Sequence, residues 1–180
     1  MNANQLVGGT PAPASAKTDR GVADLNGLDQ PDRNRPVHLP NIERPNQPVV
    51  LFVTVCTKER RPILATDQVH AVLIRVWPQA EQYRVGRYVI MPDHIHLFCA
   101  PTSCEPENVK HWVAFWKRLA TIELRELRPI WQRDCWDTQL RQVHHYSEKW
   151  QYVVGNPVRK GLVDAPEQWP FQGCLNELGW

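Results

Sequence analysis

The chain lacks any apolar run approaching the ~18 residues that a membrane-spanning helix needs. Its first residues, MNANQLVGGTPAPASAKT, have neither a basic start nor an apolar core, so they do not resemble a secretory signal. The five cysteines are an odd number without CxxC spacing, which argues against a disulfide framework and against a zinc ribbon. We therefore expect a cytoplasmic protein with reduced thiols and no membrane partner.

The chain also lacks a strong excess of charge of either sign, since its formal net charge is only +2. A balance this mild permits nucleic-acid binding without requiring it. The positive residues gather in small clusters, at 58–61, 117–118, 125–133 and 159–160. Such clusters are more often solvated surface than a binding site.

The first 48 residues lack apolar periodicity and hold 7 of the 16 prolines. Their five Lys/Arg balance five Asp/Glu, so this segment carries no net charge. A stretch of this composition buries too little apolar surface to offset the entropy of ordering it. We predict a disordered tail over 1–48 and a single domain over 49–180.

What the domain does contain is a regular alternation of strand and helix patterns. Apolar spacing predicts strands at 49–57, 86–91 and 94–101, and helices at 67–82 and from 106 to a point before Pro129. An irregular strand is expected within 130–141, and a third helix within 144–157 that Gly155 and Pro157 end. The predicted fold class is α+β, an antiparallel sheet with covering helices on one side.

Two histidines stand one residue apart in MPDHIHLF, residues 91–98. On a strand His94 and His96 share one face, with Cα atoms roughly 6 to 7 Å apart, so both rings can reach one cation. Neutral imidazole suits Mn, Zn, Ni or Cu, and Mg in company with oxygen ligands. The alternative is a pair of hydrogen-bonded histidines on a half-exposed, solvent-accessible sheet face.

The third predicted helix carries Tyr152 and, four residues later, Asn156. Positions four apart on a helix lie on one face, so the hydroxyl and the amide oxygen could point to the same place. An amide oxygen is a plausible third metal ligand, and a tyrosine beside a cation is a plausible nucleophile. The alternative is that Tyr152 packs in the core and Asn156 caps the helix.

Three motifs in this order, YVIMPDHIHLF, WQRDCWDTQLR and QYVVGNPVRKGLV, resemble the REP-associated tyrosine transposases, single-tyrosine members of the HUH class. The resemblance covers about residues 49–178. It implies a ferredoxin-like HUH endonuclease fold in which His94, His96 and Asn156 bind Mg²⁺ or Mn²⁺. It also implies that Tyr152 attacks single-stranded DNA. Cys135 stands where relatives commonly have an aromatic residue, and the proline-rich tail is not part of the family pattern.

The resemblance implies a transposase that binds hairpins of REP-like palindromes and cuts and rejoins DNA through a 5′-phosphotyrosine, near the nucleoid in the cytoplasm. Its expected partners are single-stranded DNA and DNA hairpins, bound by a monomer or a homodimer. The candidate contacts to the DNA backbone are Arg60, Arg61, Lys117 and Arg133. Two alternatives stay open at this point: a hairpin-binding protein of the same fold that does not cleave, and an unrelated metalloenzyme with a small substrate.

Overall fold

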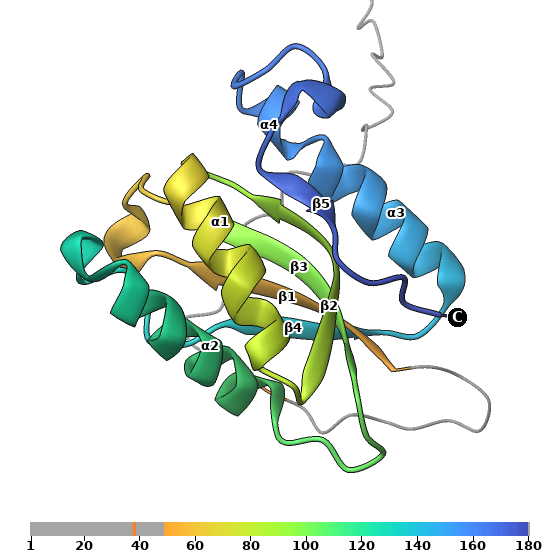
Figure 1. Cartoon of the computed structure of the whole chain (residues 1–180). Helices are drawn as coiled ribbons and strands as arrows, with labels where there is room; N and C mark the ends of the chain where they lie inside the picture. The colour runs from red at the N-terminus through yellow and green to blue at the C-terminus, as the bar shows by residue number, and fades with distance from the viewer. Residues whose placement is uncertain (1–37, 39–48, 180) are drawn as a thin grey trace, which may run out of the picture. The chain divides into compact units, whose positions relative to one another are not determined.

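The computed structural model describes residue 38 and residues 49–179, all of which fall within one compact unit. Its elements follow the chain in the order shown in Figure 1: β1 (Val50–Cys56), α1 (Asp67–Val76), β2 (Tyr83–Ile90), β3 (His94–Pro101), α2 (Val109–Glu123), β4 (Trp136–Leu140), α3 (Val143–Val154), α4 (Asn156–Arg159) and β5 (Gln172–Cys174). Apart from His38, the predicted tail over 1–48 lies outside the described residues. Among the residues described, no helix is both long and apolar enough to span a membrane.

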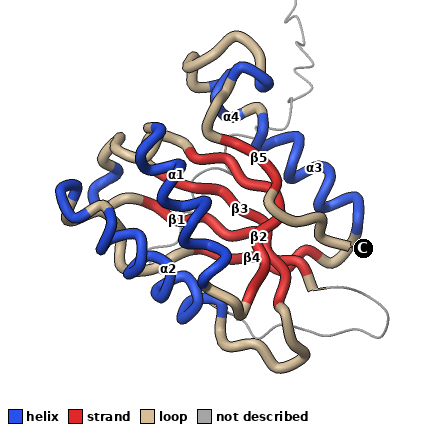
Figure 2. The backbone as a smooth tube through the Cα atoms, viewed as in Figure 1, coloured by secondary structure: helices blue, strands red, loops and turns tan. Residues whose placement is uncertain are grey.

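The strands form one antiparallel sheet in the order β4-β1-β3-β2-β5 (Figure 2). β3 is the central strand and forms a hairpin with β2. This arrangement confirms the predicted α+β class and the predicted hairpin. β5 was missed, because three residues are too few to display the alternation by which strands are recognised.

Side chains of β1 alternate between two apolar layers. Leu51, Val53 and Val55 belong to the larger core, which also contains the buried faces of α1 and α2. Val50 and Phe52 point to the opposite face, where they form a smaller core with Val153 of α3. The prediction that all helices lie on one side of the sheet is therefore wrong: α1 and α2 cover one face and α3 packs on the other. The sheet is apolar on both faces, so each face needs cover from water.

Local signals set the ends of α1 and α2. The Thr66 hydroxyl caps α1 by accepting from the backbone N–H of Val69, and Pro78 turns the end of this helix into a 3₁₀ turn at Trp77–Gln79. The Asn108 side chain caps α2 in the same way, through the N–H of Lys110. Trp77, directly after α1, packs edge to face on Trp116 of α2, with ring centroids 6.1 Å apart.

The third predicted helix is divided in two. α3 ends at Val154, Gly155 forms its C-cap, and a separate short helix, α4, begins at Asn156. The expectation that Tyr152 and Asn156 share one continuous helix is therefore wrong. Pro157 explains the break, since proline is tolerated in the first turn of a new helix but not in the interior of a continuing one.

Candidate functional site

The two histidines converge at the start of the central strand. His94 and His96 lie on the face of β3 that α3 covers, opposite Cys56 and Thr54 of β1. Their Nε2 atoms are 3.1 Å apart and their ring planes are nearly perpendicular, at 81°. Both residues are buried, with 2% and 3% of their surface exposed. The shared face is confirmed, but the expectation that this face is accessible to solvent is wrong.

The other nitrogen of each ring has its own partner. His94 Nδ1 is 2.7 Å from Oδ1 of Asp93, and His96 Nδ1 is 2.9 Å from Oγ1 of Thr54. Phe52 stacks on the His96 ring, with centroids 5.3 Å apart. These contacts fix the orientation of both rings, as outer partners of metal-binding histidines commonly do.

The arrangement of nitrogens suits a cation. When Asp93 and Thr54 accept the Nδ1 protons, each Nε2 carries a lone pair, and two lone pairs facing each other at 3.1 Å repel unless a cation or a shared proton lies between them. Imidazole nitrogens are ligands that Mn²⁺ accepts readily, and Mg²⁺ less so. The donor set therefore fits the expected divalent metal, with the two Nε2 atoms as ligands.

A short basic loop after β1 lies beside this pair. Arg60 Nε is 2.8 Å from Oδ2 of Asp93, so Arg60, Asp93 and His94 form a chain of polar contacts. Burial favours a raised pKa for Asp93, but the hydrogen bond to His94, together with the His94 and Arg60 charges, outweighs burial and lowers the pKa. Glu59 and Arg60 adopt left-handed backbone, with φ of 58° and 55°. That conformation costs about 1–2 kcal/mol per residue and is typical of functional loops.

Arg159 of α4 connects Tyr152 and Asn156. Its guanidinium carbon lies 4.1 Å from the centroid of the Tyr152 ring, and its Nη2 donates to the Tyr152 carbonyl and to Oδ1 of Asn156. Tyr152 is half-buried and packs against the smaller core, on the same side of the sheet as His96. Although the helix breaks at Gly155, the Arg159 guanidinium thus contacts both Tyr152 and Asn156.

Asn156 is 99% buried, and its Nδ2 has no hydrogen-bond partner among the described residues. An amide flip would place two donors together at Arg159, so the contact with Arg159 requires Oδ1 on that side. Because Oδ1 of Asn156 already accepts from Arg159, only its second lone pair could bind a metal ion. Asn156 is therefore a less direct fit as a ligand than the two histidines.

The candidate DNA contacts lie in different surroundings. Arg60 and Arg133 are exposed, whereas Arg61 donates to the carbonyl of Pro129, at 2.8 Å. Lys117 is only 7% exposed, and its Nζ donates to the carbonyl of Gln132 at 2.6 Å. Burial lowers the pKa of Lys117. Its position differs from the surface location expected of a DNA contact, and it supports the loop that carries Arg133.

Sequence reasoning missed three residues that shape this site: Thr54, Asp93 and Arg159. Asp93 directly precedes His94, so its proximity was visible in the sequence. Thr54 reaches His96 only because β1 and β3 pair, 42 residues apart in the chain. Arg159 was counted in a basic cluster, and only the turn at Gly155 brings it back over Tyr152.

The order β4-β1-β3-β2, with α1 and α2 crossing one face, is a ferredoxin-like arrangement. Two facing imidazoles lie on its central strand, and a tyrosine lies on the helix that covers the face opposite α1 and α2. The arrangement matches the fold expected of the HUH class. No protein-family model matches the chain.

Known relatives agree with this fold class. The chain is 27% identical over 124 residues to the REP-associated tyrosine transposase of Escherichia coli (strain K12), an alignment that covers 67% of the chain and 73% of that protein. A Haemophilus influenzae (strain Rd) relative, which carries the same name with a provisional qualifier, is 27% identical over 145 residues, or 71% of the chain and 80% of that protein. A solved REP-associated tyrosine transposase, bound to a REP hairpin, superimposes with a TM-score of 0.60 at 23% identity, over 74% of the chain and 82% of that structure. The resemblance indicated by the three motifs is confirmed.

Proposed function

We propose that the protein is a metal-dependent transposase that cleaves and rejoins single-stranded DNA at hairpin-forming repeats, through a 5′-phosphotyrosine intermediate. The observation that carries this proposal is the pair of buried imidazoles whose Nε2 atoms face each other at 3.1 Å, on the side of the sheet against which Tyr152 packs. The names of the relatives support it, since both are described as tyrosine transposases.

His94 and His96 would hold Mg²⁺ or Mn²⁺, with the amide oxygen of Asn156 as a third ligand. A bound ion supplies charge neutralisation at a non-bridging oxygen of the scissile phosphate. The Tyr152 oxygen attacks the phosphorus and gives up its proton, and the bond from phosphorus to the 3′ oxygen breaks. The products are a 5′-phosphotyrosine and a free 3′-hydroxyl, which can reverse the step on another strand. Arg159 holds the Tyr152 ring and the Asn156 oxygen in place.

The DNA partner would be a hairpin with an unpaired flank, as the name of the solved relative suggests. Arg60, Arg61 and Arg133 are the proposed contacts to its phosphates: the first two stand on the basic loop that lies beside His94, and Arg133 is an exposed cation before β4. Lys117 would act indirectly, by holding the Gln132 carbonyl next to Arg133. This reaction needs neither water nor ATP and is compatible with a monomer or a homodimer acting on DNA in the cytoplasm, near the nucleoid.

The test is covalent trapping. Incubated with a single-stranded hairpin oligonucleotide and Mn²⁺, the full chain should form an adduct that survives denaturing electrophoresis, and mass mapping should place it on Tyr152. Tyr152→Phe should form none. Tyr146→Phe is the matched control, because Tyr146 lies on the same helix, packs against Phe98 and should keep wild-type adduct formation.

Each other outcome contradicts a specific part of the proposal. An adduct that persists in Tyr152→Phe would refute the nucleophile. Cleavage without any covalent species would indicate water as the nucleophile and a hydrolytic nuclease. Tight hairpin binding without cleavage would favour the non-cleaving hairpin-binding protein of the same fold.

A further inference from the structure

A second group of metal-ligating side chains lies on the other face of the sheet. One ligand atom each from His38, Cys135 and Asp137 fall within 4.8 Å of one another. Asp137 of β4 pairs with Val53, whose side chain points into the larger core beneath α1 and α2. His94 and His96 point to the opposite face, so this cluster is separate from the candidate active site.

Cys135 is the metal-ligating residue of this group that an ion pair between His38 and Asp137 would not need. It is 99% buried and forms no disulfide. Burial, together with the neighbouring Asp137 charge, raises the pKa of its thiol to about 12. A buried thiol beside an imidazole and a carboxylate is the kind of ligand that a soft cation converts to a thiolate.

The surroundings of His38 set which of its nitrogens could bind. His38 Nε2 is 2.9 Å from Oδ1 of Asp134, and its Nδ1 contacts Oδ1 of Asp137. Asp134 is anchored in turn by Lys110 Nζ at 2.9 Å and by the backbone N–H of Cys135 at 3.0 Å. A histidine that donates one ring N–H to an anchored carboxylate presents its other nitrogen to a metal, as in carboxylate–histidine–zinc arrangements.

We propose that His38 Nδ1, Cys135 Sγ and an Asp137 oxygen form a Zn²⁺ site that fastens residue 38 to β4. A set of one nitrogen, one sulfur and one oxygen, completed by water, suits tetrahedral Zn²⁺. Thiolate disfavours Mg²⁺ and Mn²⁺, the ions expected at His94 and His96. Binding releases the thiol proton and the proton shared by His38 and Asp137, and forms three bonds to the ion.

The competing interpretation is an imidazolium held between two carboxylates. A doubly protonated His38 would satisfy Asp134 and Asp137 without any ion and would leave Cys135 without a role. The two interpretations differ in whether the sulfur binds, so the experiment should report on the sulfur directly.

Cobalt is the probe, because Co²⁺ occupies zinc sites and gives an intense near-ultraviolet charge-transfer band when a thiolate binds it. Titrated with Co²⁺, the full chain should develop this band with a stoichiometry of one, and Zn²⁺ should abolish it. Cys135→Ser should remove the band. His38→Ala should weaken Co²⁺ binding at least about tenfold. Cys174→Ser, which changes an exposed thiol outside the cluster, should leave the titration unchanged.

His38→Ala also guards against misfolding as an explanation, since residue 38 lies outside every helix and strand. Zinc should raise the thermal midpoint of the wild type and of Cys174→Ser more than that of His38→Ala, which keeps only the imidazole pair of His94 and His96 as a zinc site. The absence of a band in the wild type would establish the ion-pair interpretation and overturn the proposal. A band retained in Cys135→Ser, or Co²⁺ affinity unchanged in His38→Ala, would overturn it as well.

Discussion

At the scale of single residues, the burial of His94 and His96 changes what their removal should do. The double substitution His94→Ala with His96→Ala should abolish cleavage and also lower the free energy of unfolding by about 1–3 kcal/mol, because Asp93 and Thr54 lose their partners in a buried site. Denaturant unfolding and a nicking assay measure the two effects. His144→Ala with His145→Ala, which changes two exposed histidines of α3, should alter neither. Normal cleavage by the first variant would refute the metal site.

Thr54 tests whether the orientation of His96 matters. Thr54→Val keeps the shape of the side chain and removes the hydroxyl that contacts His96 Nδ1 at 2.9 Å. Loss of such an outer partner typically weakens metal binding 10–100-fold. We expect the Mn²⁺ concentration for half-maximal cleavage to rise by about that factor. Thr138→Val, at an exposed position of β4, is the control and should leave it unchanged. Equal metal dependence in the two variants would exclude a role for the Thr54 hydroxyl.

At the scale of elements, the junction of α3 and α4 depends on Gly155. A Cβ at this position would lie 2.8 Å from Nη1 of Arg159, the far end of a flexible side chain. The backbone at Gly155, with φ of −82° and ψ of −6°, is open to alanine, so Gly155→Ala should change stability by less than about 1 kcal/mol.

Gly155→Ala should nevertheless move the guanidinium away from Tyr152 and Asn156 and slow cleavage at least about tenfold, with hairpin affinity within a few-fold of the wild type. Single-turnover cleavage and a binding titration measure these two quantities. Gly179→Ala, where nothing lies within 4 Å of the added Cβ, is the control. Undiminished cleavage by Gly155→Ala would show that the Arg159 contacts are not needed.

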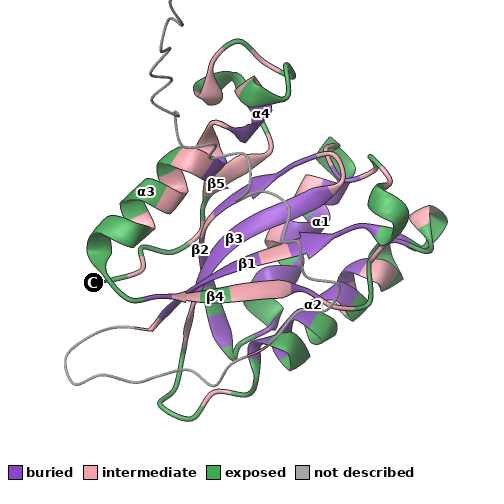
Figure 3. Ribbon diagram, turned by 180° about the vertical axis from the view of Figure 1, so that it is seen from behind, coloured by how far each residue is buried: buried purple, intermediate pink, exposed green. Residues whose placement is uncertain are grey.

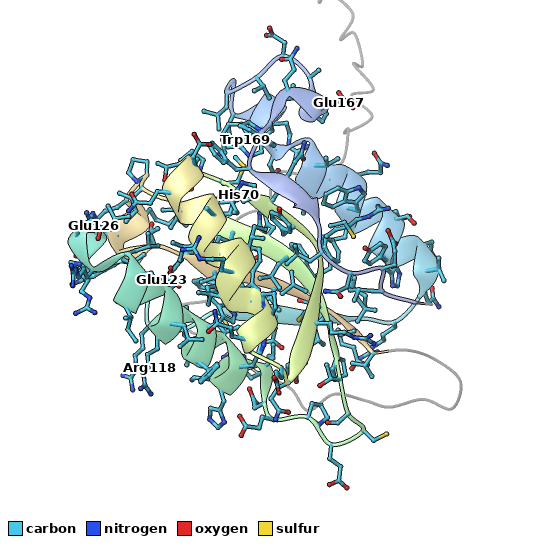
Figure 4. All side chains as sticks on the ribbon, viewed as in Figure 1. His70, Arg118, Glu123, Glu126, Glu167 and Trp169 are labelled. Carbon is cyan, nitrogen blue, oxygen red and sulfur yellow. The ribbon has the colours of Figure 1, made fainter. Side chains whose placement is uncertain are left out.

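Lys117 joins α2 to the segment that precedes β4. Lys117→Met keeps the aliphatic length but leaves the Gln132 carbonyl without its buried donor, which should cost about 1–3 kcal/mol. Arg118→Met is the matched control. Arg118 follows Lys117 in α2, is exposed and points away from the sheet (Figure 4), so loss of the Arg118 side chain should cost less than about 0.5 kcal/mol. Thermal or denaturant unfolding of the two variants is sufficient, and equal stability would contradict the supporting role of Lys117.

At the scale of the whole molecule, the basic loop beside His94 and the outer surface of α1 and α2 should differ in DNA binding. Arg60→Ala with Arg61→Ala should weaken hairpin binding and reduce the slope of log K against log salt by about one to two, because each phosphate contact contributes roughly 0.7–0.9. Arg75→Ala with Arg118→Ala removes two exposed charges from α1 and α2, on the opposite layer, and should leave the slope unchanged. Titrations in the Tyr152→Phe background separate binding from cleavage. Equal slopes in both pairs would remove the basic loop from the DNA contact surface.

The sequence by itself determined the elements and their chemistry. Apolar spacing is a local property, so β1, the β2–β3 hairpin, α1 and α2 could be predicted from it, and Pro78 and Gly155 marked two helix ends. The alternation of a strand placed His94 and His96 on one face. The motifs around His94, Tyr152 and Asn156 indicated the family resemblance.

Tertiary structure decided what surrounds those residues. Burial of the histidines follows from strand pairing and from packing on both faces of the sheet, where β1 and β3 are almost wholly buried (Figure 3). The Thr54–His96 contact spans 42 residues, and the contact of His38 with Asp137 spans 99. No local pattern encodes such pairs, because they depend on how the strands are ordered in the sheet. The same reason hid the placement of α3 on the second face and the return of Arg159 over Tyr152.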